Sequence, residues 1–342
     1  MGMNIYLTLD YELYMGDHVG TVQKCLIEPT DILIRLFDRY NAKCTFFVDA
    51  AYLYQLNKVR VSYDNLNRDF LLIKKQLKHL VLCGHDIQLH IHPQWYYAEY
   101  TGKDWKLNTS FYKLSDLKKE EAIDFFLKSK LLLEAIVEKP IIAFRAGGYS
   151  IQTLEYLQEL FSKTGVIIDS SVLSMKKANG PCQVYDYSNI DSGKEYFFNY
   201  DVTIPIKTGV FMEMPITTVK NSLFKYVINY IKYKLIKPCN KITYGDGAAV
   251  SNHFFSNRKK NWLAKICRIW EYSKENVVAS LDNGKSMYLM DIYHKQKKEK
   301  FIVIIGHPKN LSRVSLIDTE KFLKETYSEC KYDVFSSLNI EA

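Results

Sequence analysis

Residues 86–92 read DIQLHIH, and this run carries the pattern that decides the fold. It has the length of a β-strand, with apolar residues at every second position and two histidines towards its end. Pro93 follows directly, and proline ends a strand because it has no N–H to donate to the sheet. The run therefore predicts a buried strand that delivers His90 and His92 to its carboxyl end.

Six further runs have this length and are mostly apolar, as strands buried on both faces should be. Helix candidates lie between them, the clearest at 116–138 with Ser115 as its N-cap. Strands that alternate with helices predict an α/β fold with a parallel sheet, and seven strands predict a closed or nearly closed β/α barrel. The six runs are NIYLTLD (4–10), KCTFFVD (43–49), IIAFRA (141–146), VIID (166–169), GVFMEMP (209–215) and FIVIIGH (301–307).

Polar side chains stand at or just beyond the carboxyl ends of these strands. In β/α barrels this rim is where active sites are built. One polar residue at a strand end is uninformative, but five that converge on one rim predict a functional site. The five are Asp10, His92, Arg145, Asp169 and His307.

The three histidines of GHDIQLHIHP (84–93) are not equivalent. His90 and His92 are two residues apart, so on a strand they point to the same side. His85 has the other parity and lies ~16 Å back from His90 at ~3.3 Å per residue. One metal ion needs its ligands within ~2.2 Å, so we expect His85 to be structural. His90 and His92 with one carboxylate would form a ligand set that suits Zn²⁺, although other divalent ions accept it.

Further residues could serve such a site. Asp10 and Glu12 are also two apart, so these carboxylates can divide the work of metal ligand and proton acceptor; the alternative is a solvated turn. Arg145 can hold a carboxylate by a bidentate pair, and the two glycines that follow leave the backbone free to approach a ligand. His307 is a candidate general acid, and Asp169 could orient it or line the groove.

Composition narrows the class of protein. The 342 residues are 47% hydrophobic and 25% charged, as in globular proteins, and the formal charge is +8. This charge suits an acidic partner, an anionic membrane surface or neither, and nothing else indicates nucleic-acid binding. Seven cysteines are scattered without a CxxC pair, which is typical of reduced thiols. Because there is no secretory signal and no run of ~18 apolar residues, we expect a soluble, cytoplasmic protein.

Residues 216–300 do not follow the alternation of strands and helices. They include two basic, aromatic helix candidates, 219–237 and 258–276. We interpret the whole chain, 1–342, as a single barrel domain in which 216–300 is an insertion before the last strand. The lysine-rich faces fit solvated helix surface; the alternative is that 219–237 contacts a membrane or a lipid-linked or anionic saccharide.

Taken in order, the motifs resemble those of the polysaccharide deacetylases of the NodB-homology type, carbohydrate esterase family four. The resemblance covers about residues 4–215 and 300–312 and implies a distorted (β/α)₇ barrel. It also implies that Asp10 is the general base, Glu12 a metal ligand, Arg145 the tether of the base and His307 the acid that protonates the leaving group. The motifs are LTLDYE (7–12), GHDIQLHIHP (84–93), FRAGGYS (144–150), DSS (169–171) and GHP (306–308).

Two departures from the family pattern accompany these motifs. The common pattern places its second histidine four residues after the first, and position 94 is glutamine here. The metal pair is then either His90 with His92, which strand parity favours, or His90 with another residue. Gly147–Gly148 also replaces the usual proline of the third motif. This change falls in the loop that the resemblance assigns to the oxyanion hole, so the conformation of that loop could differ here.

The implied activity is removal of an N-acetyl or N-formyl group from an amino sugar of a polysaccharide or its precursor, in surface polysaccharide biosynthesis. Water at a divalent metal, Zn²⁺ above all, would attack the amide with Asp10 as base and His307 as acid. A backbone N–H near Tyr149 would stabilise the oxyanion.

Two other residues are candidates for substrate binding. Trp95 follows the metal motif and could stack on a sugar ring, with packing as the alternative. Glu213 stands at another strand end and could contact the substrate. A rival interpretation of the whole chain is a non-catalytic carbohydrate-binding protein on a degenerate barrel, which Gln94 alone favours.

Overall fold

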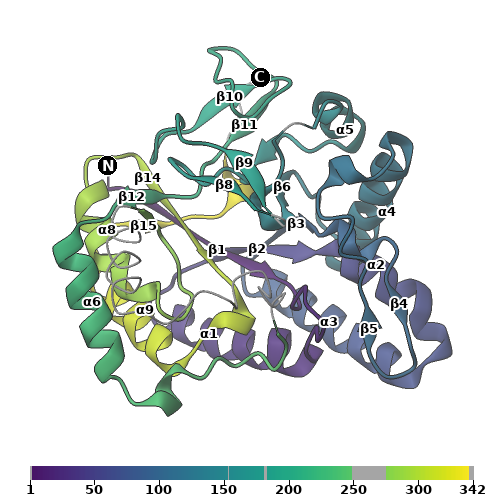
Figure 1. Ribbon diagram of the computed structural model, residues 1–342, viewed down its shortest axis with the longest axis horizontal. Coiled ribbons are helices and arrows are strands. Elements are labelled where there is room, and N and C mark those ends of the chain that lie inside the picture. Colours follow the sequence, from purple (N-terminus) through teal and green to yellow (C-terminus); the bar gives the residue numbers. More distant parts are fainter. Residues whose placement is uncertain (1, 153, 181–182, 249–274, 339–342) are drawn as a thin grey trace, which may run out of the picture.

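The computed structural model describes residues 2–152, 154–180, 183–248 and 275–338. Its centre is a curled sheet with helices packed around the outside (Figure 1). Seven parallel strands lie in the order β11–β7–β6–β3–β2–β1–β14, and they correspond to the seven runs that the sequence predicts. Their bounds are β1 (Asn4–Tyr11), β2 (Cys44–Asp49), β3 (Asp86–Ile91), β6 (Ala143–Ala146), β7 (Ile168–Asp169), β11 (Phe211–Glu213) and β14 (Phe301–Gly306).

The central strands are buried on both faces, which explains their nearly continuous apolar sequence. Every residue of β2 and β14 is buried, and so is every residue of β1 after Asn4. Parallel neighbours need crossover connections, and these connections lay helices over the sheet. The predicted α/β class and β/α architecture are confirmed.

Helices cover the sheet between successive strands. The predicted helix at 116–138 is α4, but Ser115 is not its N-cap. Ser115 lies instead in a separate 3₁₀ turn, Leu114–Asp116, because the Asp116 carboxylate accepts hydrogen bonds from the backbone N–H groups of Tyr112 and Lys113. The covering helices are α1 (Glu28–Asp38), α2 (Ala50–Val59), α3 (Asp64–Leu82), α4 (Lys119–Val137), α5 (Leu157–Thr164) and α9 (Arg313–Thr326).

Segments of the insertion bridge the two outermost parallel strands. Thr217, which follows β11, donates its N–H to Val303 O of β14 at 3.1 Å, and its Oγ1 accepts from Val303 N at 3.0 Å. Leu281 N donates to Ile305 O at 2.8 Å, and Ile305 N donates to Ala279 O at 2.9 Å. These bonds link the edges of the curled sheet and complete a distorted barrel.

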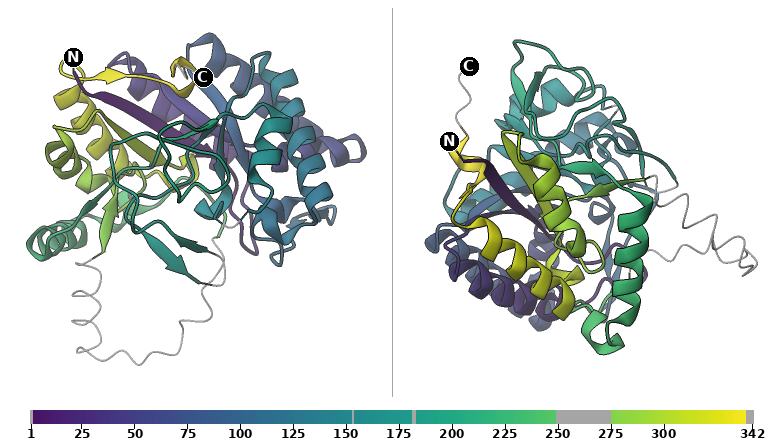
Figure 2. Two further views of the ribbon diagram at one scale, coloured as in Figure 1. Left: turned by 90° about the horizontal axis from the view of Figure 1, so that it is seen from above. Right: turned by 90° about the vertical axis from the view of Figure 1, so that its left-hand side faces the viewer.

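The predicted insertion, 216–300, runs from the closing strands of the barrel to α6, which lies at the outer edge of the molecule (Figures 1 and 2). The first basic candidate, 219–237, forms α6 (Leu223–Leu235). The second, 258–276, falls almost wholly outside the described residues. The insertion also contains β12 (Thr218–Lys220), β13 (Asn276–Val278) and α8 (Leu289–Gln296).

The remaining strands are short additions to the curled sheet and to its connections. They are β10 (Tyr196–Phe198), antiparallel to β11; β15 (Lys331–Tyr332), beside the start of β1; and the pairs β4 (Glu99–Tyr100) with β5 (Trp105–Lys106) and β8 (Lys177–Asn179) with β9 (Val184–Asp186).

Within the described ranges, no helix has the length and apolar character needed to cross a membrane.

Candidate functional site

The carboxyl ends of β1, β3, β6 and β14 meet at one rim of the barrel. Asp10, His90 and Arg145 lie at the ends of the first three strands, and His307 directly follows the fourth. His90 and Arg145 are register partners on β3 and β6. His307 Nε2 lies 3.7 Å from Asp10 Oδ2 and 3.7 Å from Glu12 Oε1, so side chains from opposite ends of the sequence form one cluster.

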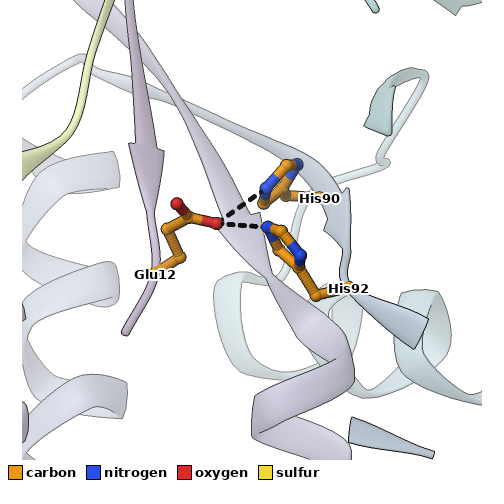
Figure 3. A group of neighbouring side chains, drawn as sticks. All are labelled: Glu12, His90 and His92. Carbon is orange, nitrogen blue, oxygen red and sulfur yellow. Dashed lines mark hydrogen bonds and ion pairs between the residues drawn. The ribbon is translucent and has the colours of Figure 1, made fainter. Parts of the chain in front are cut away.

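Glu12, His90 and His92 lie at the centre of this cluster (Figure 3). Glu12 Oε2 is 3.0 Å from His90 Nε2 and 2.5 Å from His92 Nε2. One ligand atom from each of the three buried side chains lies within 4.8 Å of the others. The two histidines point to the same side of their strand, as their spacing predicts, and both reach the carboxylate that follows β1.

The surroundings of the two imidazoles suit a divalent metal. His90 Nδ1 lies 2.7 Å from the backbone O of Arg145, so the N–H on Nδ1 donates to that carbonyl and the ring presents Nε2 to Glu12. His92 Nδ1 is buried and has no hydrogen-bond partner among the described residues. Gly147 makes room for that ring, because a Cβ there would lie 2.6 Å from His92 Nδ1. Two imidazoles and a carboxylate match the donor preferences of Zn²⁺.

Lys309 belongs to this cluster although the sequence did not single it out. Its Nζ donates to Glu12 Oε1 at 2.8 Å and to Leu13 O at 2.6 Å, so it holds one carboxylate oxygen and leaves the other facing the histidines. Burial would raise the pKa of Glu12, but the Lys309 ammonium and the imidazoles of His92 and His90 hold that pKa well below its usual range. Glu12 is therefore an anion, as a metal ligand must be.

Arg145 is fully buried and holds the carboxylate of Asp10 by a hydrogen bond. Its Nη1 donates to Asp10 Oδ1 at 2.7 Å and to Thr8 Oγ1 at 2.9 Å. Its Nε and Nη2 donate to the carbonyl and hydroxyl oxygens of Ser170, each at 2.9 Å. The pair with Asp10 is a single contact rather than the expected bidentate one, because Thr8 and Ser170 take the other donors.

His307 is held by Asp282 of the insertion. The Nδ1 of His307 lies 2.9 Å from Asp282 Oδ2, and its backbone N–H donates to Asp282 Oδ1 at 2.8 Å. Burial would lower the pKa of His307, but Asp282, with Asp10 and Glu12 nearby, raises it above its ordinary value. The imidazole can therefore carry the proton that a general acid donates, with Nε2 aimed at the cluster.

Asp169 does not orient His307, which corrects one of the two roles considered for it. Its carboxylate accepts from the backbone N–H of Ser171 at 3.0 Å and from its hydroxyl at 2.8 Å, and it faces Glu213, its register partner on β11. Burial raises the pKa of both carboxyls, and the like charge of Asp169 pushes the pKa of Glu213 further, well above its usual range. Glu213 therefore keeps its proton more readily than an ordinary glutamate does. Glu213 has no exposed surface for the contact with substrate that the sequence suggested.

Trp95 is also buried, and packing rather than sugar stacking accounts for it. Its Nε1 donates to Asp49 Oδ2 at 2.8 Å. Its ring lies against Tyr52 and Trp105, with centroids 4.7 Å and 5.5 Å away. Its side chain is completely covered, so the expected role in substrate binding is corrected.

Tyr149 stands in a strained turn after β6. Its backbone is left-handed, with φ of 62°, and follows Gly148, with φ of 59°. Tyrosine rarely adopts this conformation, and such residues cluster at functional sites. A Cβ at Gly148 would lie 2.7 Å from the Tyr112 ring, so the turn depends on glycine there.

His85 and Gln94 lie beyond the two ends of β3. His85 precedes β3 at its far end, where its Nδ1 accepts from Cys44 N at 3.3 Å, so the prediction that it is structural is confirmed. Gln94 is buried in the turn Pro93–Trp95, and its side-chain amide has no hydrogen-bond partner within the described residues.

Sequence reasoning missed Asp282 and Lys309 for different reasons. Lys309 lies in the 3₁₀ turn Pro308–Asn310 after β14, where the strand period of two residues no longer applies. Asp282 lies between β13 and α8 in a segment without regular periodicity. No feature of the sequence around Asp282 indicates that its side chain faces the rim of the barrel.

Fold and site together define a β/α barrel with a buried two-histidine, one-carboxylate centre at its strand ends. No family model and no curated protein matches the chain. Among solved structures, a putative polysaccharide deacetylase from Mycobacterium smegmatis aligns over 98% of this chain and 89% of its own, with 13% identity and a TM-score of 0.49.

Two further solved structures align over a similar length. A probable polysaccharide deacetylase from Pseudomonas aeruginosa covers 97% of this chain and 88% of its own, with 12% identity and a TM-score of 0.47. An allantoinase covers 97% and 87%, with 10% identity and a TM-score of 0.46. Likenesses this distant say nothing of activity, which depends on the residues of this chain.

Proposed function

We propose that the protein is a metal-dependent hydrolase that removes an N-acetyl or N-formyl group from an amino sugar of a polysaccharide or its precursor. The main support is the convergence of a tethered carboxylate, a metal-ligand set and a positioned imidazole, with His307 Nε2 3.7 Å from both Asp10 and Glu12. Amide hydrolysis requires a base, an electrophilic centre and an acid around one bond. The amino sugar as substrate rests on the ordered motifs of the sequence.

Glu12, His90 and His92 would hold the metal, and Zn²⁺ suits this ligand set best. When bound, it would supply Lewis acidity that polarises the amide carbonyl and lowers the pKa of water. Lys309 would keep Glu12 in place through Oε1, so that Oε2 stays directed at the two histidines.

The other groups would move protons. Asp10 would accept a proton from the attacking water through Oδ2, because Arg145 holds Oδ1. A backbone N–H near Tyr149 would bind the oxyanion. His307 would then donate its Nε2 proton to the departing amine, and Asp282 would stabilise the imidazolium before the transfer.

Release of acetate or formate tests the proposal. Metal-loaded protein should release one of them from an N-acylated amino-sugar precursor, and Asp10→Asn should abolish the release. Asp17→Asn, the same change at an exposed position in the loop after β1, should leave it intact. If no member of a panel of N-acylated amino sugars and their oligomers releases acid, the proposed activity is wrong.

A non-catalytic carbohydrate-binding protein is the second candidate. Gln94, where the family pattern has a ligand, and Lys309, which neutralises Glu12, favour it. A degenerate centre should hold no stoichiometric metal after reconstitution, whereas the hydrolase should hold one ion per chain. The cytoplasmic location and the role in surface polysaccharide biosynthesis are also proposals, and fractionation of the source cells with an antibody would test the first.

A further inference from the structure

Helix α6 exposes an apolar stripe on its outer side. Phe224, Ile231 and Leu235 are 73%, 52% and 80% exposed. Their spacing of seven and eleven residues places them within ~40° of one another at ~100° per residue. Leu223, about 100° round the helix from Phe224, and Ile242, seven residues beyond the end of α6, are also exposed, at 48% and 70%.

Lysines flank this stripe and no acid interrupts them. Lys232 and Lys234 lie about 80° to either side of the stripe on the helix. The stretch between Glu213 and Asp246 contains six lysines and no aspartate or glutamate. The outer side of α6 is therefore both apolar and strongly cationic.

The opposite side of α6 is fastened to the barrel. Lys225 pairs with Asp291 of α8 at 2.7 Å, and Tyr233 OH donates to Asn283 Oδ1 at 3.2 Å. Asn229, between them on the helix, is buried. These contacts fix the rotation of α6, and the helix itself lies at the outside of the molecule (Figure 2).

We propose that this side of α6 docks onto the surface of an anionic lipid bilayer. A helix with an apolar face bordered by lysines lies in the membrane interface, where the apolar side chains enter the headgroup region and the ammonium groups meet lipid phosphates. A second copy of the chain fits less well, because a twofold contact would bring the same lysines against each other. An anionic bilayer would balance the charge of the lysines and at the same time cover the apolar stripe.

Vesicle sedimentation tests the docking surface independently of catalysis. The full chain should bind phosphatidylglycerol–phosphatidylcholine vesicles but not phosphatidylcholine vesicles, and added salt should weaken the binding. Ile231→Ser with Leu235→Ser, and separately Lys232→Glu with Lys234→Glu, should each lower the partition coefficient about tenfold or more. Phe224→Ser provides a second apolar variant if the first pair lowers the melting temperature.

Two control variants match these changes elsewhere on the surface. Leu131→Ser on α4 removes an apolar side chain of equal exposure, 52%. Lys321→Glu with Lys324→Glu on α9 changes the net charge by the same amount. Both controls should bind vesicles as the unaltered chain does.

Three outcomes would overturn the proposal. The unaltered chain could fail to bind anionic vesicles, or the stripe variants could bind as well as the controls. The third is a dimer in sedimentation velocity that Ile231→Ser with Leu235→Ser converts to a monomer, without vesicle binding, which would assign the stripe to a second copy. The assay measures partition rather than acid release, so its failure and that of the proposed hydrolysis are separate results.

Discussion

His307 receives its orientation from a carboxylate that lies 25 residues earlier in the chain. Asp282 binds both the ring Nδ1 and the backbone N–H, so one side chain sets the position and the charge of the imidazole. If His307 is the acid, Asp282 is a positioning residue whose charge should matter as well as its shape.

Asp282→Asn keeps a hydrogen-bond acceptor for His307 but removes the negative charge that stabilises the imidazolium. We expect kcat for acid release to fall about a hundredfold, within the range for general-acid catalysis, with little change in KM. Asp291→Asn, in the same insertion but paired with Lys225, is the control. An unchanged kcat for Asp282→Asn would remove His307 from the proposed role of acid.

The raised pKa of Glu213 should make the stability of the chain depend on pH. The pKa of Glu213 is raised in the folded chain, so its contribution to stability is fully present below the unfolded pKa and is lost as the pH rises towards the folded pKa. Glu213→Gln cannot ionise. Above the unfolded pKa and up to the raised folded pKa, the free energy of unfolding should fall more steeply with pH for the unaltered chain, by up to ~1.4 kcal/mol per pH unit.

Urea unfolding at several pH values measures this difference. Glu155→Gln, an exposed change on the surface before α5, should retain the slope of the unaltered chain. Parallel slopes for the unaltered chain and Glu213→Gln would mean that Glu213 is already ionised in the folded state.

At the scale of the element, the strand β3 shows what the sequence could determine. A period of two residues fixes which side chains share a side, so His90 and His92 could be paired and His85 excluded from the sequence alone. The same reasoning failed where no period exists. Asp282 lies in an irregular segment, and the start of α4 depends on a turn that the Asp116 side chain stabilises locally.

The residue after the short strand β6 contributes to the site because it has no side chain. Gly147, directly after β6, touches the His92 ring, and a Cβ would lie 2.6 Å from Nδ1 and 2.8 Å from Ile91 O. Gly147→Ala should displace His92 and lower the affinity for Zn²⁺ by ten- to a hundredfold, as changes beside metal-binding histidines do.

Competition with a chromogenic chelator measures that affinity without reference to activity. Gly180→Ala is the matched control, since its Cβ would meet no atom closer than 3.9 Å. Equal affinities for the two variants would show that His92 is not a ligand, and would leave His90 with a partner other than His92.

For the whole molecule, the prediction that 1–342 is one domain with an inserted segment can be tested by calorimetry. The bonds from Thr217, Ala279 and Leu281 to β14, and the pair of Asp282 with His307, join the insertion to the barrel. We expect a single transition in which the calorimetric and van't Hoff enthalpies agree. Two resolved transitions would mean that 216–300 folds as a unit of its own.

The barrel could be predicted from sequence because its strands repeat one pattern seven times, whereas the way it closes could not. Closure depends on Thr217 and on residues 279–281, which pair with β14 through the insertion rather than as a further apolar strand. The burial of Trp95 and Glu213 also escaped prediction. Both residues lie at or near strand ends, but their side chains are fully buried. Their burial depends on the packing of neighbouring side chains, which the sequence pattern does not reveal.

The pairing of β1 with β14 has a consequence for synthesis. Glu12 and Lys309 are 297 residues apart, so at ~5–20 residues per second the first leaves the ribosome roughly 15 to 60 s before the second. The proposed ligand set and the proposed base lie within the first half of the chain, but the proposed acid and the edge partner of β1 come almost last. A nascent chain, or one terminated before residue 307, therefore lacks the proposed acid and cannot carry out the proposed proton transfer to the leaving amine.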